Sequence, residues 1–167
     1  SSTRTDTYSS ISASIGSLKG PMHGGANSMV TKMVEDIKKN TNPYDEVKLK
    51  EYLKKIFQKE VFDKKGRIYG MGHAVYTISD PRAVILKKKA YELAKEKKAL
   101  EEFELFSSIE KLTREIGKEL KGKNFEICAN VDLYSGFVYK LLNIPQNIFT
   151  PLFALSRIAS WNAHRME

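Results

Sequence analysis

The chain carries, at residues 70–82, the stretch Gly70-Met71-Gly72-His73-Ala74-Val75-Tyr76-Thr77-Ile78-Ser79-Asp80-Pro81-Arg82. Its glycines predict a tight turn whose backbone can approach a ligand closely. Asp80 and Pro81 occupy positions typical of a helix N-cap and a first helical residue, so a helix is expected to begin there. Arg82 would lie in its first turn, where the helix dipole disfavours a cation. An arginine there indicates an anionic partner, either a ligand carboxylate or phosphate or an acidic side chain of the protein.

Apolar residues spaced three and four apart predict further helices on both sides of this stretch. They are expected over about 6–18, 26–40 and 45–58 upstream and over about 81–98, 101–120, 130–141 and 150–167 downstream. Asp6 and Thr150 are candidate N-caps, with Pro151 as a first helical residue. Only the segments 68–69 and 125–129 are expected to be extended. The sequence therefore predicts an all-α fold.

Length and composition indicate a soluble globular protein. The 167 residues suffice for one domain plus part of another, and 41% of them are hydrophobic and 29% charged. No apolar run approaches the roughly 20 residues of a membrane span, and no segment reads as a signal peptide. The single cysteine, Cys128, excludes an internal disulfide. We therefore expect a cytoplasmic protein with no membrane partner.

The net charge of +8 raises the possibility of nucleic-acid binding. The lysines are spread over several predicted helices among acidic neighbours, and no zinc-finger spacing or RNA-binding aromatic motif accompanies them. We therefore expect no nucleic-acid partner. The charge is compatible with an acidic, phosphorylated small ligand that is steered to a basic cleft.

The histidines are the main candidates for chemistry. His23 and His73 each stand beside glycine at breaks between predicted helices, where a histidine either caps backbone groups or donates a hydrogen bond to a ligand carbonyl. His164 falls on the last predicted helix and is expected at the surface or an interface. Metal binding is a poor explanation, because the histidines are far apart and no carboxylate or cysteine spacing joins them. Cys128 has no activating motif and is expected to be a small buried residue.

Asp132 and Arg157 complete the set of candidates. Asp132 stands at the start of a predicted helix, where it is either the N-cap or a general base of raised basicity. Arg157 lies on an otherwise apolar helix, where an arginine is usually paired with the protein or with a ligand.

These motifs, taken together, resemble citrate synthase. The resemblance rests on four segments in the family order, which are 20–27 (GPMHGGAN), 70–82, 130–136 (NVDLYSG) and Ser156-Arg157. It implies an all-α homodimer of the tricarboxylic acid cycle that condenses acetyl-CoA with oxaloacetate and water to citrate and CoA. It implies no permanently bound cofactor, because CoA enters and leaves as part of substrate and product.

The resemblance also implies a role for each candidate residue. His23 would hydrogen-bond the thioester carbonyl while Asp132 removes a methyl proton, and His73 would polarise and then protonate the ketone of oxaloacetate. Arg82 and Arg157 would hold the carboxylates of oxaloacetate. The remaining candidates would contact CoA, namely Gly70, Met71, Gly72 and Asn130. These assignments agree with the chemistry of a weak carbon acid, which needs a base and an electrophile acting together.

The resemblance divides the chain into three parts. Residues 24–141 would form the small, closing domain that binds CoA, and residues 1–23 and 142–167 would be helices of the large domain. Relatives extend upstream and downstream, with a further oxaloacetate-binding histidine and an arginine that reaches across the dimer, so we expect little or no turnover from this chain alone. Thr77 stands where relatives often carry a basic residue near the CoA phosphates, so a nearby lysine supplies that contact or it is missing.

Two alternatives remain open at this point. A 2-methylcitrate synthase, which uses propionyl-CoA, shares the same motifs. A non-catalytic module for acyl-CoA binding or assembly would need the glycine loop but not the acid–base residues.

Overall fold

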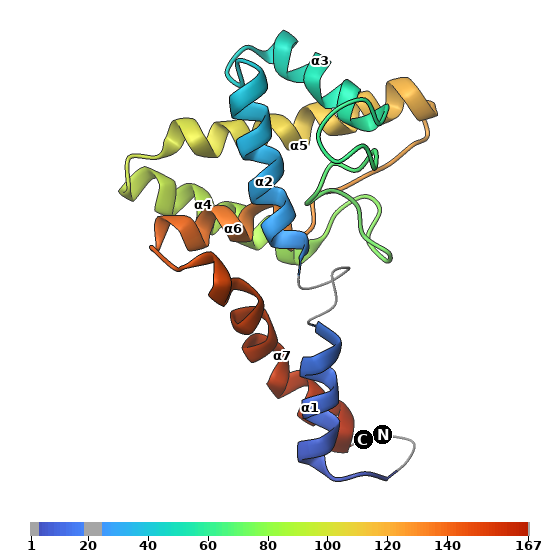
Figure 1. Ribbon diagram of the computed structural model, residues 1–167, viewed down its shortest axis with the longest axis vertical. Helices are drawn as coiled ribbons and strands as arrows, with labels where there is room; N and C mark the ends of the chain where they lie inside the picture. Colours follow the sequence, from blue (N-terminus) through green and yellow to red (C-terminus); the bar gives the residue numbers. More distant parts are fainter. Residues whose placement is uncertain (1–3, 19–24, 167) are drawn as a thin grey trace.

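The computed structural model describes residues 4–18 and 25–166. All regular secondary structure in these ranges is helical, apart from one isolated antiparallel bridge between Met71 and Ala129. The molecule consists of a helical body and a projecting pair of helices (Figure 1). The prediction of an all-α fold is confirmed, and His23 lies outside the described residues.

The body is built from helices α2 to α6. Their bounds are Ala26–Asn40 for α2, Glu46–Phe57 for α3, Pro81–Glu96 for α4, Leu100–Lys121 for α5 and Val131–Leu141 for α6. Helix α6 packs against α2 and α4, while α5 packs against α3 and α4. The long segments between α3 and α4 and between α5 and α6 contain no helix and run alongside one another near the bridge at Met71.

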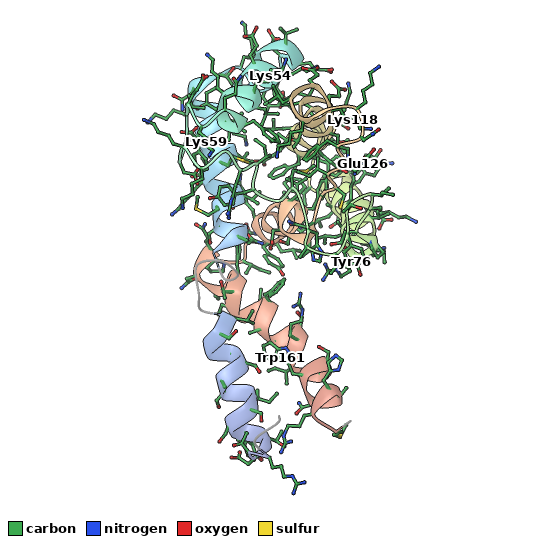
Figure 2. All side chains as sticks on the ribbon, turned by 90° about the vertical axis from the view of Figure 1, so that its right-hand side faces the viewer. Lys54, Lys59, Tyr76, Lys118, Glu126 and Trp161 are labelled. Carbon is green, nitrogen blue, oxygen red and sulfur yellow. The ribbon has the colours of Figure 1, made fainter. Side chains whose placement is uncertain are left out.

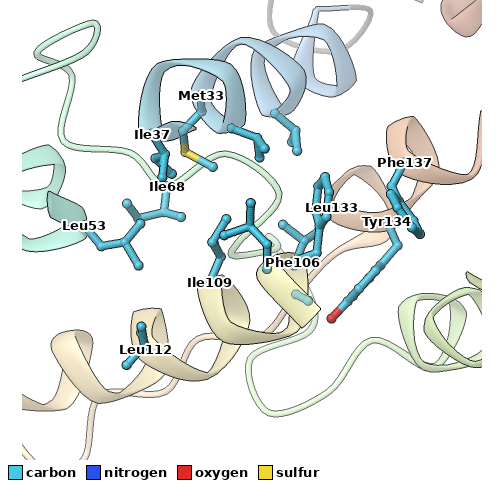
Figure 3. Packing of buried hydrophobic residues seen from close by; sticks show 14 of the residues in the cluster. Met33, Ile37, Leu53, Ile68, Phe106, Ile109, Leu112, Leu133, Tyr134 and Phe137 are labelled. Carbon is cyan, nitrogen blue, oxygen red and sulfur yellow. The ribbon is translucent and has the colours of Figure 1, made fainter. Parts of the chain in front are cut away.

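One apolar core fills the space between these helices (Figure 3). Met33 and Ile37 of α2 point toward Leu53 of α3 and Ile109 of α5, and all four side chains are fully buried. These residues recur at intervals of three or four along their helices, which places them on one face. At the other end of the core, rings from α5 and α6 pack at centroid separations of 5.2–6.5 Å, namely Phe103, Phe106, Tyr134 and Phe137.

The arm, which we define as α1 (Thr7–Leu18) and α7 (Phe149–Met166), projects from the body. The two helices run antiparallel and side by side in Figures 1 and 2, and Trp161 marks α7 in the second view. Arg165 donates a hydrogen bond to the carbonyl of Thr5 at 2.6 Å near the far end of the arm. The arm leaves large apolar side chains exposed, including Tyr8 at 86% and Leu155 at 66%.

Most of the expected helix starts are confirmed by their caps. The carboxylate of Asp6 accepts from the amide of Ser9 at 2.9 Å, and that of Asp80 accepts from the amide of Arg82 at 3.0 Å with Pro81 in the first turn. Asp45 likewise caps α3 through the amides of Val47 and Lys48. A side chain that accepts from an orphan amide of the first turn stabilises a helix locally, which is why the sequence predicts these starts well.

The expected start of the last helix at Thr150 is wrong. A 3₁₀ turn over Gln146–Ile148 leads directly into α7, which already begins at Phe149. Thr150 and Pro151 therefore lie inside the first turn rather than at the cap. Pro151 is tolerated there because the first amides of a helix have no intrahelical acceptor.

No helix in the described part of the chain is both long and apolar enough to cross a membrane.

Candidate active site

The glycine loop, residues 68–74, is fastened to the segment that precedes α6. The amide of Gly72 donates to the carbonyl of Cys128 at 2.7 Å, and the amide of Asn130 donates to the carbonyl of Gly70 at 2.9 Å. Asn130 Nδ2 also donates to the carbonyl of Gly72 at 2.8 Å. Gly70 has a φ of +83°, and a Cβ there would lie 2.7 Å from the Cα of Leu133. Only glycine combines this left-handed backbone with so close an approach to α6.

His73 belongs to the glycine loop, and backbone amides set the orientation of its ring. Its Nδ1 accepts from the amide of Val75 at 3.0 Å and from the amide of Tyr76 at 3.3 Å. Backbone amides can only donate, so Nδ1 is the acceptor and the neutral ring carries its proton on Nε2. Nε2 lies 3.1 Å from Nη2 of Arg82. Two N–H donors therefore face one another, and an oxygen placed beside them would accept from both.

Arg82 has the anionic partner that its place in the first turn of α4 indicates, and that partner is Asp80. Its Nε and Nη2 donate to the two carboxylate oxygens of Asp80 at 3.0 and 2.9 Å, and the Asp80 side chain is fully buried. The hydrogen bonds from Arg82 hold the pKa of Asp80 below its ordinary value despite the burial. The Arg82 side chain is 43% exposed. A guanidinium has five N–H donors, and three of them remain for other acceptors.

Asp132 stands in the first turn of α6. The sequence leaves open whether it is the N-cap of this helix or a general base, and Asn130 bears on the first of these roles. Asn130 is the N-cap, because its Oδ1 accepts from the amide of Asp132 at 2.9 Å. The carboxylate of Asp132 is therefore not needed as the cap.

One cavity of about 780 Å³ gathers these groups. Its walls include His73, Arg82 and Asp132 together with the glycine loop and Asn130. Phe153 and Arg157 of α7 complete it, with the Arg157 guanidinium carbon 4.2 Å from the centroid of the Phe153 ring. No carboxylate of the described residues forms an ion pair with Arg157. The cleft brings together every described candidate except His164, which is exposed on α7.

Three basic residues of the cleft are not singled out by the sequence pattern. Lys32 lies on α2, and Lys65 and Arg67 precede the glycine loop; all three are exposed. In the sequence, Lys65 and Arg67 belong to the cluster Lys64-Lys65-Gly66-Arg67 shortly before residue 70, which the pattern alone indicates only as a turn. Lysines at a turn are usually solvated, so only the fold shows that these cations face the same cleft.

A half-buried charge cluster on α5 links this helix to α4 and α6. Glu110 of α5 accepts from the Tyr134 hydroxyl at 2.7 Å, from Lys87 at 2.9 Å and from Arg114 at 2.8 Å. Burial alone would raise the pKa of Glu110, but the hydrogen bonds from Tyr134 and Lys87 outweigh it and hold that pKa below its ordinary value. Burial and the bond to Glu110 raise the pKa of Tyr134. The cluster therefore keeps an ionised carboxylate and a neutral phenol inside the body.

Cys128 is buried, as the sequence predicts, and its thiol contacts the carbonyl of Tyr76 at 3.3 Å. Burial raises the pKa of this thiol. A thiol of raised pKa is a poor nucleophile, so Cys128 supports the packing of the loop rather than chemistry.

The fold and the cleft define an all-α protein in which a histidine, an aspartate and two arginines line one cavity. The family model described as "Citrate synthase, C-terminal domain" matches residues 1–167. The chain therefore belongs to the citrate synthase family.

Named relatives agree with this assignment. The chain is 42% identical to a citrate synthase from a Synechocystis species over 99% of its own length and 38% of the relative, and 35% identical to a 2-methylcitrate synthase from Corynebacterium glutamicum over 100% and 39%. Among solved structures it is similar to a citrate synthase from Thermoplasma acidophilum in ternary complex with carboxymethyl coenzyme A and oxaloacetate. That similarity has a TM-score of 0.68 and 37% identity, over 98% of this chain and 40% of the other. The chain thus spans about two fifths of the length of these relatives.

Proposed function

We propose that this chain supplies most of the catalytic and substrate-binding groups of a citrate synthase, which condenses acetyl-CoA with oxaloacetate and water to give citrate and CoA. The observation that carries the proposal is the single cleft that holds His73, Arg82, Asp132 and Arg157 beside the glycine loop. The relative solved with carboxymethyl coenzyme A and oxaloacetate supports the two ligands.

The ketone oxygen of oxaloacetate would lie beside the donor pair of His73 and Arg82. It would accept from Nε2–H of His73 and from Nη2 of Arg82, whose nitrogens lie 3.1 Å apart. Negative charge builds on this oxygen as the new carbon–carbon bond forms, and fixed donors stabilise that charge in the transition state. His73 then gives its Nε2 proton to the oxygen.

The carboxylates of oxaloacetate fit the two arginines. Arg82 is held rigidly by Asp80 and keeps unused donors, while Arg157 approaches from α7 on another wall of the cleft. A dianion that bridges two fixed guanidinium groups is oriented as well as bound. This orientation would turn the ketone carbon toward the thioester.

Asp132 is proposed as the base that removes a methyl proton from acetyl-CoA. The electron pair of that C–H bond forms an enolate, which attacks the ketone carbon, and water then hydrolyses the thioester of the product to release CoA. His23, which we assign from the family motif, would donate a hydrogen bond to the thioester carbonyl. A positioned general base contributes about 10²- to 10⁴-fold to such a step.

The phosphates of CoA are proposed to bind the exposed cations of the cleft. Thr77 does not line the cleft, but Lys32, Lys65 and Arg67 do. These residues would replace a basic residue at position 77. The backbone of residues 70–72 and Asn130 would contact the adenine end of CoA.

A second candidate substrate is propionyl-CoA, with 2-methylcitrate as the product. The 35% identity to a 2-methylcitrate synthase supports it. The two activities differ by one methyl group on the thioester, so the ratio of kcat/KM for acetyl-CoA and propionyl-CoA distinguishes them.

The proposal is tested by measuring release of the CoA thiol from acetyl-CoA and oxaloacetate. The assay compares these 167 residues with a polypeptide extended at both ends, because the chain spans only about two fifths of its relatives. We expect turnover from the longer protein and little or none from the shorter. Equal turnover from both would contradict the view that the catalytic site is incomplete in this chain.

The role of Asp132 is tested in the longer protein. Asp132→Asn should lower kcat by about 10²- to 10⁴-fold while oxaloacetate binding, measured by calorimetry, stays nearly unchanged. Glu101→Gln removes a first-turn acid of α5 outside the cleft and is the matched control. Parallel loss of oxaloacetate binding in Asp132→Asn would assign this residue to structure instead. CoA binding without any turnover in the longer protein would favour a non-catalytic acyl-CoA module.

We also propose a cytoplasmic homodimer that acts in the tricarboxylic acid cycle. The exposed apolar residues of the arm, such as Tyr8 and Leu155, support an assembly that covers them. Light scattering of the longer protein tests the oligomeric state, and a monomer would overturn the dimer.

A further inference from the structure

The chain turns sharply between α6 and α7 (Figure 1). A second cavity, of about 410 Å³, is lined by residues of this corner and of α2 and α5. Its walls come from α2, α5, α6 and the connection 143–149, and none of its residues lines the active-site cleft. Its volume falls in the range of small-molecule sites, which is about 300–1,000 Å³.

The inner wall of this corner cavity is apolar. Val34, Phe106, Phe137 and Phe149 line it, and each of these side chains is no more than 6% exposed. Phe106 and Phe137 lie close together at the end of the core in Figure 3. A ring or a branched alkyl group of a ligand would contact these side chains.

The rim of the corner cavity carries charges of both signs. Lys38 and Lys140 converge on one carboxylate oxygen of Glu102, at 2.6 and 3.0 Å. An ammonium has three N–H donors, so each lysine keeps donors for a second acceptor. Glu35 adds a second carboxylate to the rim, so the formal charges of these four residues cancel. A zwitterion would complement such a rim better than an anion or a cation would.

We propose that the corner cavity binds a zwitterionic α-amino acid with an apolar side chain. The carboxylate of the ligand would bind the ammonium groups of Lys38 and Lys140, its ammonium would lie near Glu35, and its side chain would lie against the wall formed by Phe106, Phe137 and Phe149. This site goes beyond the proposed condensation, and its test requires no turnover.

Occupancy of the corner cavity would hold α7 against the body. The connection turns at Asn143, which has a φ of +56°, and Phe149 at the start of α7 packs on Tyr139 with ring centroids 4.9 Å apart. A ligand that contacts Pro145 and Phe149 on one side and α2 and α6 on the other would connect α7 with the body. Because α7 also carries Arg157, this link reaches the wall of the cleft.

The test is a titration of L-phenylalanine into the ¹⁵N-labelled 167-residue chain, followed by two-dimensional NMR. We expect saturable shifts in residues 31–38, 102–106 and 136–149 and slower amide exchange at the start of α7. Glycine lacks the side chain, 3-phenylpropionate lacks the ammonium and phenethylamine lacks the carboxylate, so each should bind several-fold more weakly. No saturable binding, or shifts confined to the active-site cleft, would overturn the proposal.

Single substitutions test whether Lys140 binds the carboxylate of the ligand. Lys140→Ala should weaken L-phenylalanine binding about five- to tenfold, because a hydrogen bond to a charged group is lost. Lys95→Ala removes an exposed lysine of α4 outside the cavity and should leave the affinity unchanged. Lys140 is 64% exposed, so its loss should not unfold the chain, and thermal unfolding checks this. Equal affinity for Lys140→Ala and the unchanged chain would refute the assigned contact.

Discussion

Gly70 occupies a position that no larger residue can take without moving the start of α6. Its φ of +83° is unfavourable for residues with a Cβ, and that atom would overlap the backbone and side chain of Leu133. Overlap with the Cα of Leu133 is costly, because a backbone atom inside a helix cannot move aside as the end of a flexible side chain can.

Gly70→Ala should therefore lower the free energy of unfolding by roughly 2–5 kcal/mol, from backbone strain and overpacking together. Gly16→Ala is the matched control. Gly16 lies inside α1, and a Cβ at this position would have no neighbouring atom within 4 Å, so alanine should raise stability by about 0.5–1 kcal/mol. Urea unfolding of both variants measures the difference. A Gly70→Ala chain as stable as the unchanged chain would contradict the close approach.

The fully buried carboxylate of Asp80 has two functions, because it caps α4 and orients Arg82. Asp80→Asn keeps the shape but loses the charge, and it should cost about 1–3 kcal/mol near pH 7. The folded state lowers the pKa of Asp80 below 3.8, so the unfolded chain binds this proton more readily. The stability difference between the two chains should be constant above about pH 5 and shrink as the pH falls below 3.8.

The measurement is urea unfolding of both chains across this pH range. Other carboxylates titrate in both chains, so their contribution cancels in the difference. A difference that grew toward low pH would show that the charged form of Asp80 does not stabilise the fold.

At the scale of elements, Asn130 connects α6 to the glycine loop. Its Oδ1 caps the helix through the amide of Asp132, and its Nδ2 donates to the carbonyl of Gly72 at 2.8 Å. Asn130→Asp keeps a capping oxygen but places a second acceptor against that carbonyl. We expect the loop to loosen at a cost of about 1–2 kcal/mol while α6 stays formed.

Hydrogen exchange of the Gly72 amide, which is bonded to Cys128, reports on this change. The amide should exchange faster in Asn130→Asp, whereas amides inside α6 should keep their protection. Asn130→Ala loses both bonds and should affect loop and helix together. Unchanged exchange at Gly72 in Asn130→Asp would show that the cap alone explains this asparagine.

At the scale of the whole molecule, the cleft forms where α7 meets the body. The cleft residues of the body lie far from α7 in the sequence. Arg157 and Phe153 reach the cavity from the arm, while the other walls belong to the body. The arm contacts the body chiefly through the turn Gln146–Ile148, so the position of Arg157 depends on that corner.

Arg157→Gln should weaken oxaloacetate binding roughly 10- to 100-fold in the polypeptide extended at both ends, because a charged donor to a carboxylate is removed. Calorimetry measures the affinity. Lys95→Gln removes one positive charge outside the cleft and should have little effect. An equal loss in both variants would assign the effect to net charge rather than to a contact.

The helices were predictable because their signals are local. Asp45, Asp80 and Asn130 each bond an amide two residues ahead, so the sequence alone contains both partners. The start of α7 was mispredicted because a 3₁₀ turn before Phe149 continues into the helix, and tertiary packing of Phe149 on Tyr139 holds that turn. Packing between distant segments leaves no local signal.

The candidate site was predictable in its residue types but not in its geometry. His73 and Arg82 stand out beside glycines and in a first turn, whereas Lys32, Lys65 and Arg67 resemble ordinary surface cations. The donor pair of His73 and Arg82 arises because Asp80 and two backbone amides orient both groups. Such an arrangement depends on dihedral angles that residue spacing does not report.

The helical class, most helix starts and the motifs of the citrate synthase family can be read from the amino-acid sequence, because they depend on bonds between near neighbours or on the order of residues. It is the packing of the helices that brings residues 70–74, Arg82, residues 130–132 and Arg157 to one cleft, since burial of the common core sets the distances between them. The tertiary structure also decided the partner of Arg82. That arginine, placed against the helix dipole, is held by Asp80 and still has donors for a second anion.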